Sequence, residues 1–146
     1  NIGILEIKSL LSAKMIYAHE TGIDVTIDIP DFVAEFSMDT VDLARILGIF
    51  LDNAMEAALE TAHPKVGLNI IQSPNSAAII ISNSFQENSL ALHKLKQKGF
   101  STKKGHKGIG LSNAQKIISS YDNVLLETTK QGGYFTQYME ISARKE

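Results

Sequence analysis

The start of the chain contains two different spacings of apolar residues. At first they recur at steps of three and four, which is typical of an amphipathic helix, and this helix is predicted to end near Gly22. The residues of this first stripe are Ile4, Ile7, Leu10, Leu11 and Met15. From Ile23 to Ile29 apolar and polar residues alternate instead, and Pro30 closes the run. This period of two predicts a strand with one buried face.

A second helix is predicted after a short link. Residues 32–36 are expected to form a short strand or an irregular connection. Ser37 or Asp39 has the side chain of a helix N-cap, and the helix is expected to run to about Thr61, ahead of Pro64. Its apolar stripe consists of Leu43, Ile46, Leu47, Phe50, Leu51, Ala54 and Ala58.

Two pairs of strands are predicted in the rest of the chain. Residues 66–71 and 77–82 have the composition of strands, and the turn-rich residues 73–76 between them predict a hairpin. Residues 124–129 and 134–141 are predicted to form a second hairpin. Its turn contains Gly132 and Gly133.

Between these hairpins, residues 84–110 break the regularity. Within this polar stretch, residues 90–95 are expected to form a short helix, and the apolar spacing of residues 111–121 then predicts a third long helix. Loops of this length are usually functional or mobile. The stretch is rich in glycine and lysine, with Gly99, Gly105, Gly108, Gly110, Lys98, Lys103, Lys104 and Lys107.

The order of these elements predicts the fold class. Three helices and an antiparallel-rich set of strands indicate an α/β (α+β) fold. We expect a two-layer sandwich with a mixed, mostly antiparallel sheet against the three helices. A length of 146 residues suits one domain.

The composition narrows the classes of function. The 14 Lys and Arg residues against 16 Asp and Glu residues give a formal net charge of −2. This balance argues against a general nucleic-acid coat or a polybasic membrane clamp. The chain has no cysteine, which excludes disulfides, thiolate metal sites and a cysteine nucleophile. Its histidines lack the spacing of a structural metal site; they are His19, His63, His93 and His106.

No targeting or spanning segment is recognisable in the chain. No apolar run approaches the roughly 18–20 residues that span a bilayer, and the N-terminus lacks the pattern of a signal peptide. We therefore expect a soluble piece. Because it begins at Asn1 without Met, we expect it to be a fragment of a longer protein.

The segment from Gly105 to Leu111 is a candidate phosphate-binding site. Its glycines let the backbone approach a phosphate, and the helix that follows offers free amide hydrogens and a positive dipole end. Nearby lysines add point charges. A flexible loop with solvated lysines is the alternative reading of this segment alone. The spacing matches neither a P-loop nor a dinucleotide fingerprint, which would need a third glycine where Asn113 stands.

Two asparagines are candidates for contacts with a ligand. Asn53 lies on the border of the apolar stripe of the second helix, beside Ile49 and Glu56, where its carbonyl oxygen could ligate a magnesium ion. A half-exposed helix asparagine without a function is the alternative. Asn83 directly follows a predicted strand, and its amide could accept from the amino group of adenine or merely shape a turn.

Taken together, these segments resemble the ATP-binding domain shared by gyrase, the heat-shock chaperone ATPases, histidine kinases and mismatch-repair ATPases, the GHKL superfamily. Residues 49–58 (IFLDNAMEAA) resemble the asparagine box of histidine kinases. Residues 99–103 (GFSTK) and 107–113 (KGIGLSN) resemble the last glycine box and the segment before it. Residues 45–54 and the ending 134–137 (YFTQ) are similar to peptide-pheromone-sensing kinases of the accessory-gene-regulator and competence type.

The resemblance assigns roles to individual residues. Asn53 would hold the magnesium ion that bridges the phosphates of ATP, and Asn83 would stand where many kinases have an adenine-reading aspartate. Residues 84–110 would form the lid over ATP. The phosphates would contact Gly108, Ile109, Gly110 and Leu111, assisted by Lys103, Lys104, His106 or Lys107.

Some positions depart from the family pattern. The usual first glycine box is absent at residues 83–87 (NSFQE), which makes the adenine contact of Asn83 less secure. Glu56 stands in the nucleotide site where many kinases carry a basic residue, so a phosphate contact is lost there. Ile49 occupies the place of the glutamate that activates water in hydrolysing relatives, which favours transfer over hydrolysis. Asp52 is the nearest carboxylate and is a candidate catalytic group that polarises the incoming histidine.

The resemblance implies phosphoryl transfer from magnesium-ATP to a histidine of an upstream dimerisation domain, in two-component quorum sensing. The implied partners are ATP or ADP, that domain, and a response regulator through the full-length kinase. The piece would be the cytoplasmic domain of a membrane sensor. A serine kinase or ATPase of the same superfamily and a non-catalytic nucleotide-sensing module are the alternatives.

Overall fold

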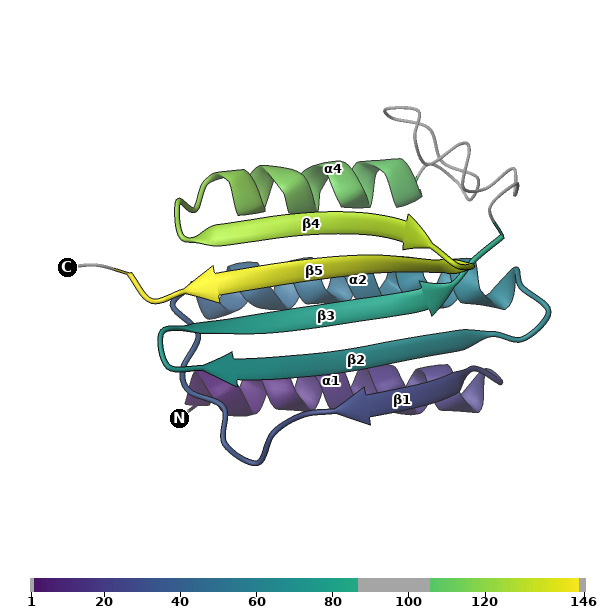
Figure 1. The fold of residues 1–146 in the computed structure, drawn as a ribbon, viewed down its shortest axis with the longest axis horizontal. Helices are drawn as coiled ribbons and strands as arrows, with labels where there is room; N and C mark the ends of the chain where they lie inside the picture. Colours follow the sequence, from purple (N-terminus) through teal and green to yellow (C-terminus); the bar gives the residue numbers. More distant parts are fainter. Residues whose placement is uncertain (1, 87–105, 145–146) are drawn as a thin grey trace.

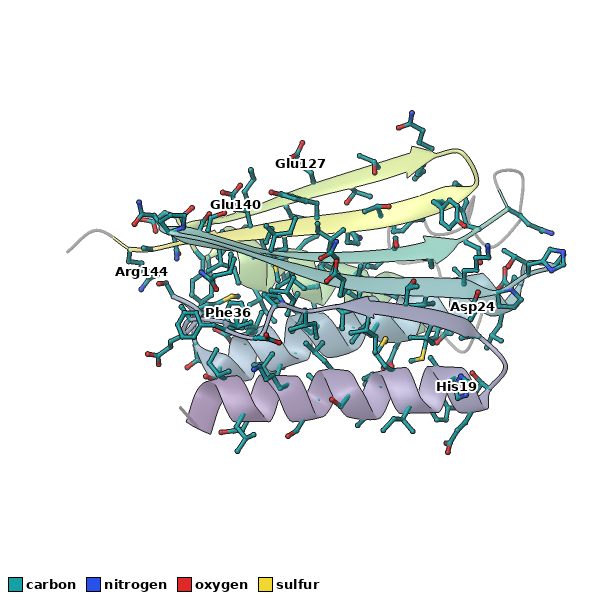
Figure 2. All side chains as sticks on the ribbon, turned by 60° about the horizontal axis from the view of Figure 1, so that its bottom comes forward. His19, Asp24, Phe36, Glu127, Glu140 and Arg144 are labelled. Carbon is teal, nitrogen blue, oxygen red and sulfur yellow. The ribbon has the colours of Figure 1, made fainter. Side chains whose placement is uncertain are left out.

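The computed structural model describes residues 2–86 and 106–144. Over these residues the chain forms a five-stranded sheet with the strand order β1-β2-β3-β5-β4. β1 pairs with β2 in parallel, and the other neighbouring strands pair antiparallel. Three described helices cover one face of this sheet (Figures 1 and 2). The predicted two-layer sandwich is confirmed.

The described elements follow one another in the predicted order. The helices are α1 (Ile2–Glu20), α2 (Thr40–Leu59) and α4 (His106–Ser119). The strands are β1 (Asp24–Asp28), β2 (Lys65–Ser73), β3 (Ser76–Ser84), β4 (Val124–Gln131) and β5 (Tyr134–Ser142). Residues 32–36 form an irregular link rather than a strand.

α2 is the central helix of the structure, and its ends have clear local causes. Asp39 is the N-cap, because its carboxylate accepts from the backbone N–H of Asp42 at 3.0 Å. The helix ends at Leu59, earlier than expected, and the N–H of Glu60 caps the carbonyls of Ala57 and Ala58. Its apolar face packs into the core with α1 and the sheet, with buried Leu43, Ile46, Leu47, Phe50, Leu51, Ala54, Met55 and Ala58.

The sheet has one buried and one open face. Along β2 and β3, alternate apolar residues such as Leu68, Ile79 and Ile81 face the helices and are almost fully buried. On the open face Glu127 and Glu140 point away from the helices (Figure 2). The β4–β5 turn uses Gly132 and Gly133 with φ of 62° and 81°, the left-handed region that glycine adopts without strain.

Two boundaries differ from the prediction. β3 continues to Ser84, so Asn83 lies within a strand and not in a turn after it. α4 begins at His106, so Gly108 and Gly110 are helical rather than part of a preceding loop. Residues 87–105, with the predicted short helix at 90–95, lie outside the described part of the chain.

Among the described helices, none has the length and apolar character that crossing a membrane requires.

Candidate functional site

Three chain segments that are distant in sequence lie close together in the structure. The C-terminal half of α2, the end of β3 and the start of α4 lie at the same end of the molecule (Figure 1). All of the described candidate residues belong to these three segments. This end of the molecule is therefore where a site would form.

One face of α2 carries Ile49, Asn53 and Glu56. The intervals of four and three residues place these side chains in one row along the helix. Ile49 packs against the core, and Asn53 and Glu56 are each partly buried. The row therefore changes from apolar to polar as it approaches the C-terminal end of α2.

α4 crosses this row of side chains in the antiparallel direction. After the end of α4, the hydroxyl of Tyr121 donates to Asp42 at the start of α2. Near the start of α4, a Cβ added to Gly110 would lie 3.4 Å from Cγ2 of Ile49. Asn53 lies one helical turn beyond Ile49, so this register places it level with the first turn of α4, which begins at His106.

The side-chain amide of Asn53 is poised for a ligand. Its Nδ2 atom is buried and has no hydrogen-bond partner among the described residues. A buried donor without a partner costs about 1–3 kcal/mol, so such groups often indicate a missing ligand, ion or water. The first turn of a helix also leaves backbone N–H groups free for an anion. The buried amide of Asn53 and the first turn of α4 lie on the same side of α2.

Asn83 is buried at the end of β3, with 2% of its surface exposed. It follows Ile79 and Ile81 at steps of two, so its side chain faces the helical layer. Its Nδ2 donates to the carbonyl of Ser84 at 2.9 Å. The amide is thus held by its own strand, and its carbonyl oxygen is the group left to accept from a ligand.

Asp52 points toward α1 rather than toward α4. Its Oδ1 atom lies 2.7 Å from Nζ of Lys14 in α1, and the aspartate side chain is 52% exposed. Asp52 and Asn53 are about 100° apart on the helix, so they serve different faces of it. The predicted catalytic role of Asp52 stays a prediction, and Lys14 is a partner that the sequence pattern did not suggest.

A hydroxyl pair that the sequence reading missed supports the end of β3. Oγ of Ser84 lies 3.0 Å from Oγ1 of Thr61 and accepts from the backbone N–H of Lys65 at 3.0 Å. The next residue, Phe85, donates its N–H to the carbonyl of Gly133 at 3.0 Å. Thr61 follows α2, so these bonds fix the distance between the end of α2 and Asn83. Serine and threonine next to a helix end carry no recognisable signal for such a role.

Other candidates are described in part or not at all. Ile109 is 55% exposed and Leu111 is partly buried, both within α4. The side chains of His106 and Lys107 are not described, and Lys103 and Lys104 lie outside the described residues. Within the described part, no three His, Asp or Glu side chains gather in a way that could hold a metal ion. A cation here would need ligands such as an amide oxygen, water and the bound molecule itself.

Comparison of the sequence with known families identifies the fold's relatives. Residues 38–142 match the family model described as the GHKL domain, which covers α2, the last four strands and α4. The chain belongs to the GHKL domain family. No sequence among the curated proteins matches this GHKL chain.

Solved structures share this fold. A nucleotide-free form of the catalytic domain of histidine kinase ThkA superposes with a TM-score of 0.73 at 20% identity, covering 93% of this chain and 89% of that one. The Acinetobacter baumannii histidine kinase AdeS gives 0.69 at 14% identity, over 95% and 64%. Full-length ShkA in complex with AMPPNP gives 0.71 at 15% identity, over 100% and 31%. These likenesses show a GHKL fold of the kind found in histidine kinases.

Proposed function

We propose that this GHKL domain binds magnesium-ATP and transfers the γ-phosphoryl group to a histidine on a separate, upstream dimerisation domain. The family and the fold support nucleotide binding and phosphotransfer in two-component signalling. A structural relative, ShkA, was solved with the ATP analogue AMPPNP. The quorum-sensing context, the peptide-pheromone subtype, the response-regulator partner and the cytoplasmic location below a membrane sensor belong to the proposal and follow from the sequence resemblance.

One observation carries the proposal: Nδ2 of Asn53, a buried donor without a partner among the described residues, lies level with the first turn of α4, where a phosphate oxygen would accept from it. Backbone N–H groups of that turn would bind other phosphate oxygens, and the amide oxygen of Asn53 would hold a magnesium ion. The ion supplies charge neutralisation for the triphosphate. The protein contributes position and fixed dipoles, which account for most of the catalysis in phosphoryl transfer.

The apolar side chain of Ile49 favours phosphoryl transfer to a protein over hydrolysis of ATP. Ile49 lies one turn before Asn53 and packs beside Gly110 at the start of α4. An isoleucine side chain has no group that can take a proton from water, so a water molecule at this position would not be activated. An incoming histidine side chain is itself a nucleophile and does not need such activation.

Titration of the protein with ATP, with and without magnesium, tests the role of Asn53. We expect Asn53→Ala to lose about tenfold or more in magnesium-dependent affinity, equivalent to ~1.4 kcal/mol. Asn69→Ala is the matched control, because Asn69 lies in the middle of β2, far from the end of β3. An unchanged magnesium-dependent affinity in Asn53→Ala would show that Asn53 does not hold the ion.

A further inference from the structure

β1 is an edge strand of the sheet, and no other described strand covers its outer edge. The backbone N–H of Asp24 donates to the carbonyl of Pro64, the residue before β2, at 2.9 Å. Backbone groups of successive residues in a strand point in opposite directions, so the N–H and C=O groups of Val25 and Ile27 point toward the open edge. An open edge of this kind is a template for pairing with another strand.

A groove of about 490 Å³ lies between α1 and β1. Its apolar lining includes Met15 and Ile16 from α1 and Val25 and Ile27 from β1. Met15 is buried, whereas Ile16 is 60% exposed and Ile27 is 52% exposed. Exposed apolar side chains that gather in one place often mark a binding surface. Because α2 lies between α1 and α4, the groove is separate from the candidate nucleotide site (Figure 1).

Exposed carboxylates border the groove and the strand. Glu20 lines the groove at the end of α1, and Asp24 and Asp28 lie at the two ends of β1, on the face of the sheet opposite to the groove. None of the three forms an ion pair with a described residue. Asp24 has Lys65 as its cross-strand neighbour, whereas Asp28 stands opposite the neutral Asn69. A segment bound at this edge is therefore favoured when it is basic.

We propose that the edge of β1 and the groove beside it bind an extended protein segment in which basic and apolar residues alternate. The segment adds a strand to the sheet, and its backbone bonds to the free groups of Val25 and Ile27. Successive side chains of a strand point to opposite faces. The apolar side chains of the segment therefore enter the groove, and its basic side chains lie beside Asp24 and Asp28 on the other face.

The same charges disfavour a second copy of this chain as the occupant. Two β1 strands that pair antiparallel around Thr26 would place Asp24 of each copy opposite Asp28 of the other. Like charges that face each other across a strand pair are destabilising. The carboxylates thus protect the edge from self-association and leave it open to a basic segment.

Titration of the isotope-labelled domain, followed by nuclear magnetic resonance, tests the inference with a short synthetic peptide in which lysine and valine alternate. We expect the amide signals of β1 and of the residues around Ile16 to shift, and the affinity to fall as salt is added. A lysine–serine peptide lacks the apolar side chains, and a glutamate–valine peptide reverses the charge. Both should bind at least about tenfold more weakly.

Substitutions at exposed positions test the two faces of the strand separately. Ile16→Ser should weaken binding of the lysine–valine peptide about fivefold, because the groove loses apolar contact. Leu125→Ser is the matched control, since Leu125 is similarly exposed on β4, the other edge strand. Asp28→Lys should weaken the lysine–valine peptide about fivefold and strengthen the glutamate–valine peptide, which a loss of folding would not do.

Three outcomes would overturn the inference. The first is the absence of shifts in α1 and β1 with the lysine–valine peptide in large excess. The second is equal affinity for the lysine–serine peptide, which would indicate attraction by charge alone. The third is broadening of the β1 signals with rising protein concentration in the absence of peptide, which would identify a second copy as the occupant.

Discussion

The hydroxyl of Ser84 joins three segments at the end of β3. It accepts from the N–H of Lys65 at the start of β2 and lies beside Oγ1 of Thr61, which follows α2. Ser84 is only 9% exposed, so water replaces these bonds poorly. The position of the neighbouring Asn83 depends on this junction.

Replacing Ser84 with alanine should therefore destabilise the domain by about 1–2 kcal/mol, because the N–H of Lys65 loses its acceptor. Urea unfolding followed by circular dichroism measures the change. Ser82→Ala is the matched control, since it removes the same group two positions earlier on the same strand. If both substitutions lower the unfolding midpoint equally, the hydroxyl of Ser84 has no special role.

The comparison of Asn53 with Ser84 shows which roles of single residues can be predicted from the sequence. The place of Asn53 on the border of an apolar stripe could be read from helical periodicity alone, and the structure finds it partly buried there. The roles of Ser84 and Lys14 depend on partners far away in the chain. Lys14 and Asp52 are 38 residues apart, and no local pattern connects them.

At the end opposite the candidate site, hydrogen bonds connect the residue that follows α4 to the start of α2. The hydroxyl of Tyr121 donates to Oδ2 of Asp42 at 2.5 Å and accepts from the N–H of Asp39 at 3.3 Å. The guanidinium of Arg144 lies 5.4 Å from the centre of the tyrosine ring. This junction holds the C-terminal end of α4 to the N-terminal end of α2, and so sets the position of the first turn of α4.

Burial, and next the hydrogen bond to Asp42, raises the pKa of Tyr121 above its ordinary value near 10. The folded state thus keeps a proton that the unfolded state releases first. The corresponding stability is complete below pH 10 and is lost as the pH rises through the pKa of the folded state. Tyr121→Phe should cost about 1 kcal/mol at neutral pH and should show a smaller further loss above pH 10.

Urea unfolding midpoints at pH values from 7 to 11.5 would measure this effect. At neutral pH we expect the midpoint of Tyr121→Phe to lie lower than that of the wild type, on the order of a few tenths of a molar in urea. Tyr17→Phe, at an exposed position of α1, is the control for general effects of removing a phenol. Parallel midpoint curves for wild type and Tyr121→Phe would contradict the proposed protonation effect.

The elements themselves were largely predictable, and the errors lie where packing overrides local preference. Alternation, three-to-four spacing, strand composition and turn residues together predicted every described strand and helix in its correct order. The start of α4 was placed too late because Gly108 and Gly110 disfavour a helix by about 1 kcal/mol each. At Gly110 the start of α4 passes so close to Ile49 of α2 that an added Cβ would lie 3.4 Å from its Cγ2, and a local sequence pattern does not contain this packing.

In the molecule as a whole, α2 extends from a structural junction at its N-terminal end to the candidate site at its C-terminal end. At one end the junction of Tyr121 and Asp42 fixes the helices, and at the other the row of Ile49, Asn53 and Glu56 meets the start of α4. The open face of the sheet carries the exposed Glu127 and the partly exposed Glu140, which point away from the helices that form this site (Figure 2). The nucleotide would thus bind at one end of the domain.

This arrangement predicts how the isolated domain behaves with ATP. Two histidine side chains are described: His19 is exposed in the last turn of α1, the helix that Asp52 rather than Asn53 faces, and His63 is exposed in the link between α2 and β2. Neither extends from the row of α2 that meets α4. The domain alone should therefore become labelled poorly by γ-labelled ATP. Mixed with its own upstream helical domain, it should transfer the label to that domain at least about tenfold faster, because that domain supplies the acceptor histidine. Phosphate that acid removes and alkali leaves in place identifies phosphohistidine. Acid-stable label would instead indicate a serine kinase of the same superfamily, and nucleotide binding without any transfer would indicate a nucleotide-sensing module.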